Sequence, residues 1–163
     1  MKVTSDNLVK HVQRLVDEAD IQRVLFDYAF HLDGNRPDEL IKNFVEDLHV
    51  SYGGEHGAKG KAAYLETLAN DKTGVGAFFA GTSHHVSNVV IDFVDEDSAN
   101  VRSVLYAWHK YNRERADGIV MGQYHDQFVR TPEGWKIKRR ELKHAGTETY
   151  HAKAAQLNPI PRP

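Results

Sequence analysis

The sequence predicts an α+β fold, in which about three N-terminal helices pack on a strongly curved, mixed but mostly antiparallel sheet. Two observations lead to this prediction. Apolar residues recur at three- and four-residue spacing early in the chain, and from residue 82 four long strand candidates follow one another. The connections between these strands are short, so neighbours in sequence are expected to pair antiparallel. Helices followed by a run of strands are typical of the α+β class.

Three helices are expected before residue 82. The first spans 5–32, where apolar side chains form one stripe, and Gly34 provides its C-terminal stop. The segment RPDELIKNF opens a short second helix, with Pro37 in its first turn. HVSYGG, residues 49–54, is typical of a short strand that ends in a glycine turn. Gly60 then leads into the third helix, KAAYLETLAN.

The second part of the chain supplies the sheet. DEDS, RADG and TPEG are turn signals that separate four strands, TSHHVSNVVIDFV, ANVRSVLYAWHKYNRE, IVMGQYHDQFVRT and GWKIKRRELKHAGTE. A long helix lying across a strongly curved sheet leaves a conical pocket between them. We expect a single domain over 1–150 and a proline-rich C-terminal tail over 151–163, because the prolines of QLNPIPRP prevent regular structure.

Composition excludes several classes of function. The net charge is −2, so neither nucleic acid nor an anionic membrane is an expected partner. The absence of cysteine excludes disulfides, thiolate zinc sites and cysteine nucleophiles. The charged, amphipathic N-terminus lacks the apolar core of a signal peptide, and no apolar run is long enough to span a bilayer, so we expect a cytoplasmic protein. The 10 histidines are unusually many and favour acid–base or metal chemistry.

Two adjacent histidines begin the first long strand. Val89, Ile91 and Phe93 share one parity, and His85 falls on it, so strict alternation predicts that His85 faces the apolar side. A β-bulge would reverse this and turn His84 inward instead. The sequence leaves both histidines as candidates.

Other polar residues are candidates with weaker local signals. Asp33 ends the first helix, where the macrodipole disfavours a carboxylate, but an aspartate beside a glycine is also common in ordinary turns. His109 shares its parity with apolar neighbours, which is more typical of an interior histidine than of a catalyst. Tyr28 and Tyr52 combine a ring suited to burial with a hydroxyl that needs a partner. Local sequence alone favours a structural interpretation for each of them.

A metal site is not expected. His84, His85, His109 and His125 lie on adjacent predicted strands and could in principle ligate zinc or iron. However, no H-x-x-x-H pair is present, and adjacent histidines on one strand point to opposite faces. The sequence also lacks the G-x-S-x-G, P-loop and G-x-G-x-x-G motifs.

The order of elements and the polar residues together resemble the SnoaL-like branch of the nuclear-transport-factor-2-like superfamily, whose fold is a cone-shaped α+β barrel. The resemblance covers about residues 8–150. Within that branch the chain is most similar to the cofactor-free lyases, namely scytalone dehydratase, hexachlorocyclohexane dehydrochlorinase and bile acid 7α-dehydratase. Their Asp–His dyad is matched by Asp33 in YAFHLDG and by His84 in TSHH.

Further positions of these lyases have counterparts in the chain. Scytalone dehydratase has a second histidine and a tyrosine that match His109 in AWHKY and Tyr52 in HVSYGG, and the bile acid enzyme has a tyrosine that matches Tyr28. There are two departures. Leu32 stands where scytalone dehydratase has a tyrosine, and His144 lies near the position of an arginine in the bile acid enzyme.

The resemblance implies a cofactor-independent, dehydratase-type lyase that acts on a small, mostly apolar, oxygenated ring compound. Asp33 would orient His84 as general base, with Tyr52 and His109 polarising a carbonyl or protonating the leaving group. The substrate would contact further side chains: Tyr28, His85, Trp108 and His144. An isomerase or cyclase of polyketide- or steroid-like substrates would use the same dyad. A non-catalytic binding module and a metal-dependent enzyme are the alternatives from other classes. The resemblance also implies a homodimer or homotrimer.

Overall fold

The computed structural model describes residues 3–53, 56–72, 74–112 and 114–150, and the predicted tail over 151–163 lies outside them. The helices are α1 (Leu8–Asp33), α2 (Pro37–Leu40), α3 (Lys61–Ala69) and α4 (Val75–Phe78), with 3₁₀ turns at Ser5–Asn7 and Ile41–Asn43. The strands are β1 (Phe44–Ser51), β2 (Gly57–Lys59), β3 (Phe79–Phe93), β4 (Ser98–Tyr111), β5 (Asp117–Thr131) and β6 (Gly134–Tyr150).

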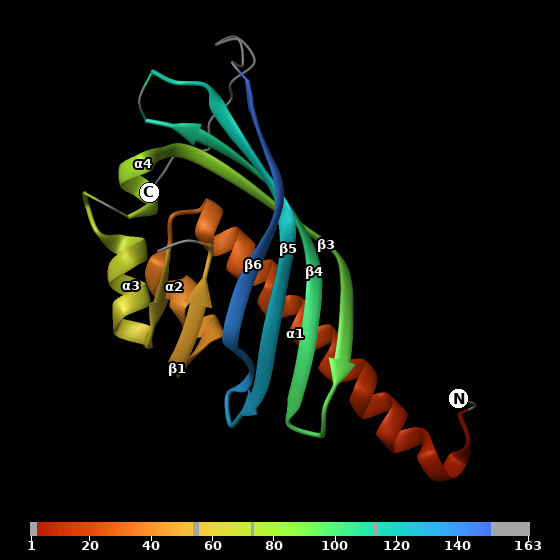
Figure 1. The fold of residues 1–163 in the computed structure, drawn as a ribbon. Helices are drawn as coiled ribbons and strands as arrows, with labels where there is room; N and C mark the ends of the chain where they lie inside the picture. The colour runs from red at the N-terminus through yellow and green to blue at the C-terminus, as the bar shows by residue number, and fades with distance from the viewer. Residues whose placement is uncertain (1–2, 54–55, 73, 113, 151–163) are drawn as a thin grey trace.

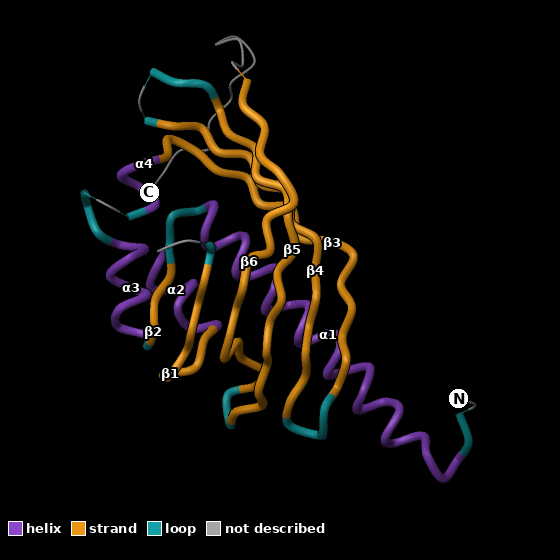
Figure 2. The backbone as a smooth tube through the Cα atoms, viewed as in Figure 1, coloured by secondary structure: helices purple, strands orange, loops and turns teal. Residues whose placement is uncertain are grey.

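These strands form one open sheet in the order β2-β1-β6-β5-β4-β3. β1 runs parallel to β6, and every other neighbouring pair is antiparallel. The four long strands bend strongly along their length, and α1 crosses one face of the sheet diagonally (Figure 1). Figure 2 shows the small helices α2, α3 and α4 gathered at the β1–β2 side of the sheet. The predicted α+β class, with a mixed and mostly antiparallel sheet, is confirmed.

One face of α1 packs on the concave side of the sheet. Ile21, Leu25 and Tyr28 are each at most 2 % exposed, and their spacing of four and three residues places them on one side of the helix. Beneath them, Arg140 of β6 and Asp126 of β5 form a fully buried ion pair with N···O distances of 2.9 and 2.7 Å. The Arg140 guanidinium stacks on the rings of Tyr28 and Tyr124, so the core beneath the helix is partly polar.

Some elements differ from the sequence-based expectation. β1 begins at Phe44 rather than at residue 49, because the register with β6 shifts between Phe44 and His49 and breaks the alternation. β2 and α4 are three and four residues long, too short for a periodic signal. Among the described residues, no helix combines the length and apolarity needed to cross a membrane.

Candidate active site

Asp33 and His84 meet where the end of α1 crosses the start of β3. Asp33 Oδ1 lies 2.6 Å from His84 Nδ1, and Oδ2 accepts a hydrogen bond of 2.8 Å from the His84 backbone N–H. Thr82 donates its hydroxyl to Oδ1 at 2.8 Å. The side chains of His84 and Asp33 are only 7 % and 18 % exposed. One carboxylate therefore holds both the backbone and the ring of the same histidine.

The ionised form of Asp33 is favoured. Burial raises the pKa of this carboxyl, but the hydrogen bonds and charge of His84, together with the Thr82 hydroxyl, outweigh it and lower the pKa below 3.8. A carboxylate only accepts hydrogen bonds, so Nδ1 of His84 carries the proton. In the neutral ring this leaves Nε2 with a lone pair, and no hydrogen bond to Nε2 occurs within the described part of the chain.

A β-bulge decides which of the two histidines faces inward. The register of β3 with β4 shifts between Ser87 and Val90, and Asn88 has a φ of 49°. Val89 therefore shares the inward parity of His84, whereas strict alternation placed it with His85. His85 is exposed on the other face of β3, beside Tyr106 of β4. Of the two alternatives that the sequence left open, strict alternation is therefore wrong and the bulge turns His84 inward, and the structure does not bring the substrate-binding candidate His85 to the Asp33–His84 pair.

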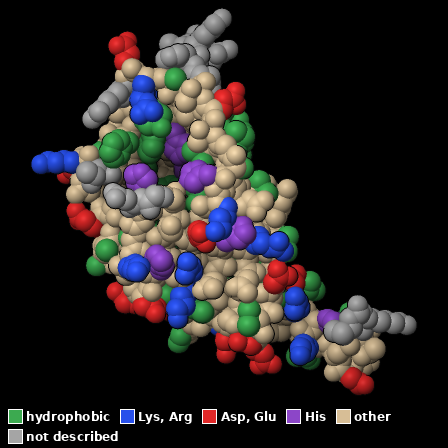
Figure 3. Space-filling view, in the orientation of Figure 1, with side chains coloured by type: hydrophobic (Ala, Val, Ile, Leu, Met, Phe, Trp, Pro, Cys, Tyr) green, Lys and Arg blue, Asp and Glu red, His purple; other side chains and the backbone are tan. Residues whose placement is uncertain are grey.

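His109 joins the pair from β4. Its ring stands edge-on to that of His84, with 5.3 Å between the ring centroids, and Phe79 packs on its other side at 4.8 Å. Burial, together with the positive charge that His84 can carry, lowers the pKa of His109 to about 4. His109 is thus neutral near pH 7. In Figure 3, histidine side chains gather beside hydrophobic ones around a hollow in the upper half of the face shown.

The tyrosines form a second cluster, on the β1 side. The Tyr28 and Tyr52 hydroxyls are 3.0 Å apart, and the Tyr52 hydroxyl also makes a short hydrogen bond to that of Tyr64, from α3. Burial raises the pKa values of Tyr52 and Tyr64 well above 10, so both remain protonated. Within the described residues no hydrogen bond joins this cluster to Asp33 or His84.

His144 and Trp108, both suggested by sequence, have other contacts. His144 is exposed, and its Nε2 donates a 2.8 Å hydrogen bond to the backbone carbonyl of Tyr52. It therefore fixes the end of β1 rather than the dyad. Trp108 points to the face of β4 opposite His109, and its Nε1 donates to the buried carboxylate of Asp117 at 3.1 Å. Neither side chain contacts Asp33 or His84.

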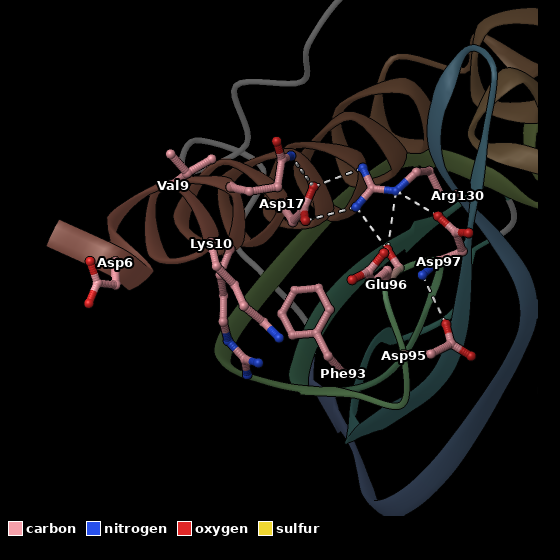
Figure 4. A pocket seen from close by; sticks show the side chains of 11 residues that line it. Asp6, Val9, Lys10, Asp17, Phe93, Asp95, Glu96, Asp97 and Arg130 are labelled. Carbon is pink, nitrogen blue, oxygen red and sulfur yellow. Dashed lines mark hydrogen bonds and ion pairs between the residues drawn. The ribbon is translucent and has the colours of Figure 1, made fainter. Parts of the chain in front are cut away.

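A cavity of about 660 Å³ lies far from the dyad, between the N-terminal half of α1 and the β3–β4 turn. Figure 4 shows that Arg130 spans it, pairing with Asp17 of α1 at 2.9 and 2.8 Å and with Asp97 of the turn at 3.0 Å. The cavity is lined by several further charged side chains, but neither Asp33 nor His84 reaches it. The described residues contain no group of three or more His, Asp or Glu side chains placed to hold a metal ion.

Sequence reasoning did not find Tyr64 or the role of Thr82. Tyr64 lies on the buried side of α3, where a tyrosine is an ordinary core residue. Only the folded chain brings its hydroxyl to Tyr52. Thr82 belongs to the TSHH segment, and its position two residues before His84 is the signal for its role, since both side chains lie on the same face of β3.

Comparison with known proteins finds solved structures with the same fold. A crystal structure from Novosphingobium aromaticivorans DSM 12444, provisionally assigned as a scytalone dehydratase, is 50% identical, covers 94% of this chain and 99% of its own, and has a TM-score of 0.79. The hexachlorocyclohexane dehydrochlorinase LinA-type3 from Novosphingobium barchaimii LL02 has the same fold at 18% identity, with a TM-score of 0.77 over 93% of this chain and 99% of its own.

An uncharacterised protein of Mycobacterium tuberculosis is 29% identical over 136 residues, which are 83% of this chain and 90% of the relative. The model of the SnoaL-like domain matches residues 13–141, which include most of α1, all of β3, β4 and β5, and the first half of β6. The chain therefore belongs to the SnoaL-like family, and its structural neighbours include dehydratase-like proteins.

Proposed function

We propose that the protein is a cofactor-independent lyase that eliminates water from a small, mostly apolar, oxygenated ring compound. The observation that carries this proposal is the pair of contacts from Asp33 to the ring and the backbone of His84. They leave Nε2 of a buried imidazole as the free base, next to a neutral His109. The 50% identical neighbour with its provisional dehydratase assignment supports the same reaction class.

The reaction begins with proton abstraction. His84 Nε2 takes a proton from a carbon next to a carbonyl, and the electron pair of that C–H bond moves toward the carbonyl oxygen. Asp33 stays ionised and stabilises the imidazolium that forms, in the way a carboxylate orients histidine in other catalytic sets. Such a positioned base is typically worth about 10²- to 10⁴-fold in rate.

The second step expels the hydroxyl group. Tyr52 keeps its proton because burial raises its pKa well above 10, and His109 is neutral because its pKa is about 4. Both donate hydrogen bonds to developing negative charge but are poor proton sources. The imidazolium of His84 is the strongest acid of the set. It returns its proton to the departing oxygen, the C–O bond breaks, and water leaves with a C=C bond formed.

The test is an elimination assay with adjacent histidines as matched variants. Purified protein is incubated with a panel of ring ketones that carry a hydroxyl β to the carbonyl, and the absorbance of the conjugated product is followed. We expect His84→Gln to lower kcat by about 10²-fold or more, and His85→Gln to stay within about twofold because His85 lies on the opposite face of β3. Equal losses in both variants, or turnover that ignores His84→Gln, would contradict the proposal.

An isomerase is the second candidate, favoured by the tyrosine hydroxyls that could hold a carbonyl oxygen. The same assay run in D₂O distinguishes it. An isomerase incorporates deuterium next to the carbonyl and moves the double bond without releasing water. A binding module takes up the ketone, as seen by calorimetry, with neither exchange nor elimination.

A further inference from the structure

The outer face of α1 is apolar although it faces solvent. Of the twelve large hydrophobic side chains that are exposed among the described residues, seven lie on this helix. Val9, Phe30 and Leu15 are 81 %, 71 % and 66 % exposed. We call the line formed by the outward positions the outer stripe: Leu8, Val12, Leu15, Ala19, Phe26 and Phe30.

The outer stripe lies opposite the face that packs on the sheet. Successive residues of a helix turn by about 100°, which places Val12 and Ala19 about 180° and 160° around the helix from Ile21 of the core. The stripe advances in steps of four and three residues over most of its length, the spacing that lets two helices pack side by side. A surface helix needs one apolar face, and α1 has two.

Most of the stripe is complementary to a copy of itself, and the exception is Leu15, which meets Arg23. In an antiparallel pair centred on Ala19, Leu8 of each helix meets Phe30 of the other, and Val12 meets Phe26, because these positions are equally distant from the centre. The small Ala19 side chain lets the two helices approach closely at the centre. Each sheet lies on the side of α1 away from the outer stripe (Figure 1).

Charge favours a copy of this chain over a membrane. Between Leu8 and Phe30 the helix has three basic and four acidic residues, and ion pairs such as Arg14–Glu18 (3.2 Å) and Arg23–Asp27 (2.8 Å) form within it. A helix that binds anionic lipid needs an excess of Lys and Arg on its polar face, which α1 lacks. Because the net charge of this part of α1 is close to zero, two identical helices do not repel each other strongly.

The other surface on which copies could pair is more polar. The outer face of the sheet presents Arg102, His125, Gln127 and Arg139 around a hollow. The exposed parts of the side chains of the outer stripe, doubled over two copies, amount to on the order of 1,000 Å², about the area that a specific interface needs. We propose that two copies of this chain pair through their outer stripes, α1 antiparallel to α1.

The first experiment measures mass in solution by analytical ultracentrifugation. We expect wild type to sediment at twice the 18.5 kDa of one chain. Val12→Glu should weaken the pairing about a hundredfold or more, because the dimer contains the buried charge twice. Tyr106→Glu, on the outer face of the sheet, and Val94→Glu, on the β3–β4 turn, should leave it intact. Circular dichroism and the melting temperature of each variant show that the fold is retained.

The second experiment tests the register of the two helices by disulfide cross-linking. The sequence contains no cysteine, so only the introduced residues can form a cross-link. Ala19→Cys should cross-link to its own copy under mild oxidation. Val12→Cys and Phe26→Cys should cross-link to each other in a mixture far better than either does alone. A monomeric wild type, or a dimer that survives Val12→Glu and dissociates on Tyr106→Glu, overturns the proposal. Cross-linking of Val12→Cys to itself in preference to Phe26→Cys overturns the register.

Discussion

Asp33 occupies a position that helix electrostatics disfavours. It is the last residue of α1, where the partial negative charge of the helix end opposes a carboxylate. Three hydrogen bonds from β3 compensate, two from His84 and one from Thr82. These contacts keep the carboxylate ionised at an unfavourable helix end, which is the state that the proposed proton chemistry requires.

The neutral state of His109 gives a prediction for stability against pH. Its pKa is 6.5 in the unfolded chain and about 4 in the folded one. Between these values only the unfolded chain binds the proton, so the free energy of unfolding falls as the pH drops from 6.5 toward 4, by about 3 kcal/mol from this residue. Urea unfolding of His109→Gln across this range should show a shallower decline than wild type. Parallel curves for the two proteins would contradict a neutral His109.

At the scale of elements, the bulge in β3 determines which residues form the site. The strand is 15 residues long and changes parity near its middle, so its first half turns His84 inward and its second half turns Val89, Ile91 and Phe93 inward. Without the irregularity, one of these two sets would face solvent.

The bulge depends on Asn88, whose φ of 49° is in the left-handed region. Asparagine and glycine tolerate this conformation, whereas a β-branched residue does not. We expect Asn88→Val to lower the free energy of unfolding by about 1–2 kcal/mol, and Asn88→Gly to have a much smaller effect. Denaturant titrations of the two variants check this. A similar loss in both would show that the side chain of Asn88, rather than its backbone conformation, is what matters.

The buried ion pair ties β5 and β6 to α1. Asp126 and Arg140 are both fully buried, and Arg140 also stacks on Tyr28 of the helix. We expect Asp126→Asn to destabilise the fold by about 3–5 kcal/mol, because it leaves a buried charge uncompensated. Asp92→Asn is the matched control. Asp92 pairs with Arg102 at the surface, where such pairs are worth about 1 kcal/mol or less. Equal losses of unfolding free energy in the two variants would mean that burying the Asp126–Arg140 pair does not increase its contribution to stability.

For the molecule as a whole, local signals in the sequence predicted most of the architecture. Apolar periodicity and turn motifs act over a few residues, which is why α1 and the four long strands were predicted within a few positions. The parallel pairing of β1 with β6 and the meeting of Tyr64 with Tyr52 join distant segments, and no local pattern encodes them.

Local sequence signals predicted the residues of the candidate site less well than they predicted the architecture. Local sequence favoured an ordinary turn residue at Asp33, and only the resemblance to known lyases singled out the pair with His84. Strict alternation of side chains along the strand indicated that His85 faces the apolar side. That indication failed because the irregularity at Asn88 interrupts the two-residue period of the strand. Asp33 ends α1 and His84 lies in the first half of β3, so their meeting depends on where α1 crosses the sheet, which no local pattern encodes.

The most direct test of the central claim is the tautomer of His84, read from the ¹⁵N resonances of its ring, with His84→Gln assigning the signals. In wild-type protein we expect a neutral imidazole with the proton on Nδ1 and an unprotonated Nε2, because Asp33 accepts from Nδ1. Asp33→Asn should remove that preference. If the ring of wild-type His84 instead exchanges between both tautomers, and Asp33→Asn leaves its resonances unchanged, the two residues do not act as a pair and the lyase proposal fails.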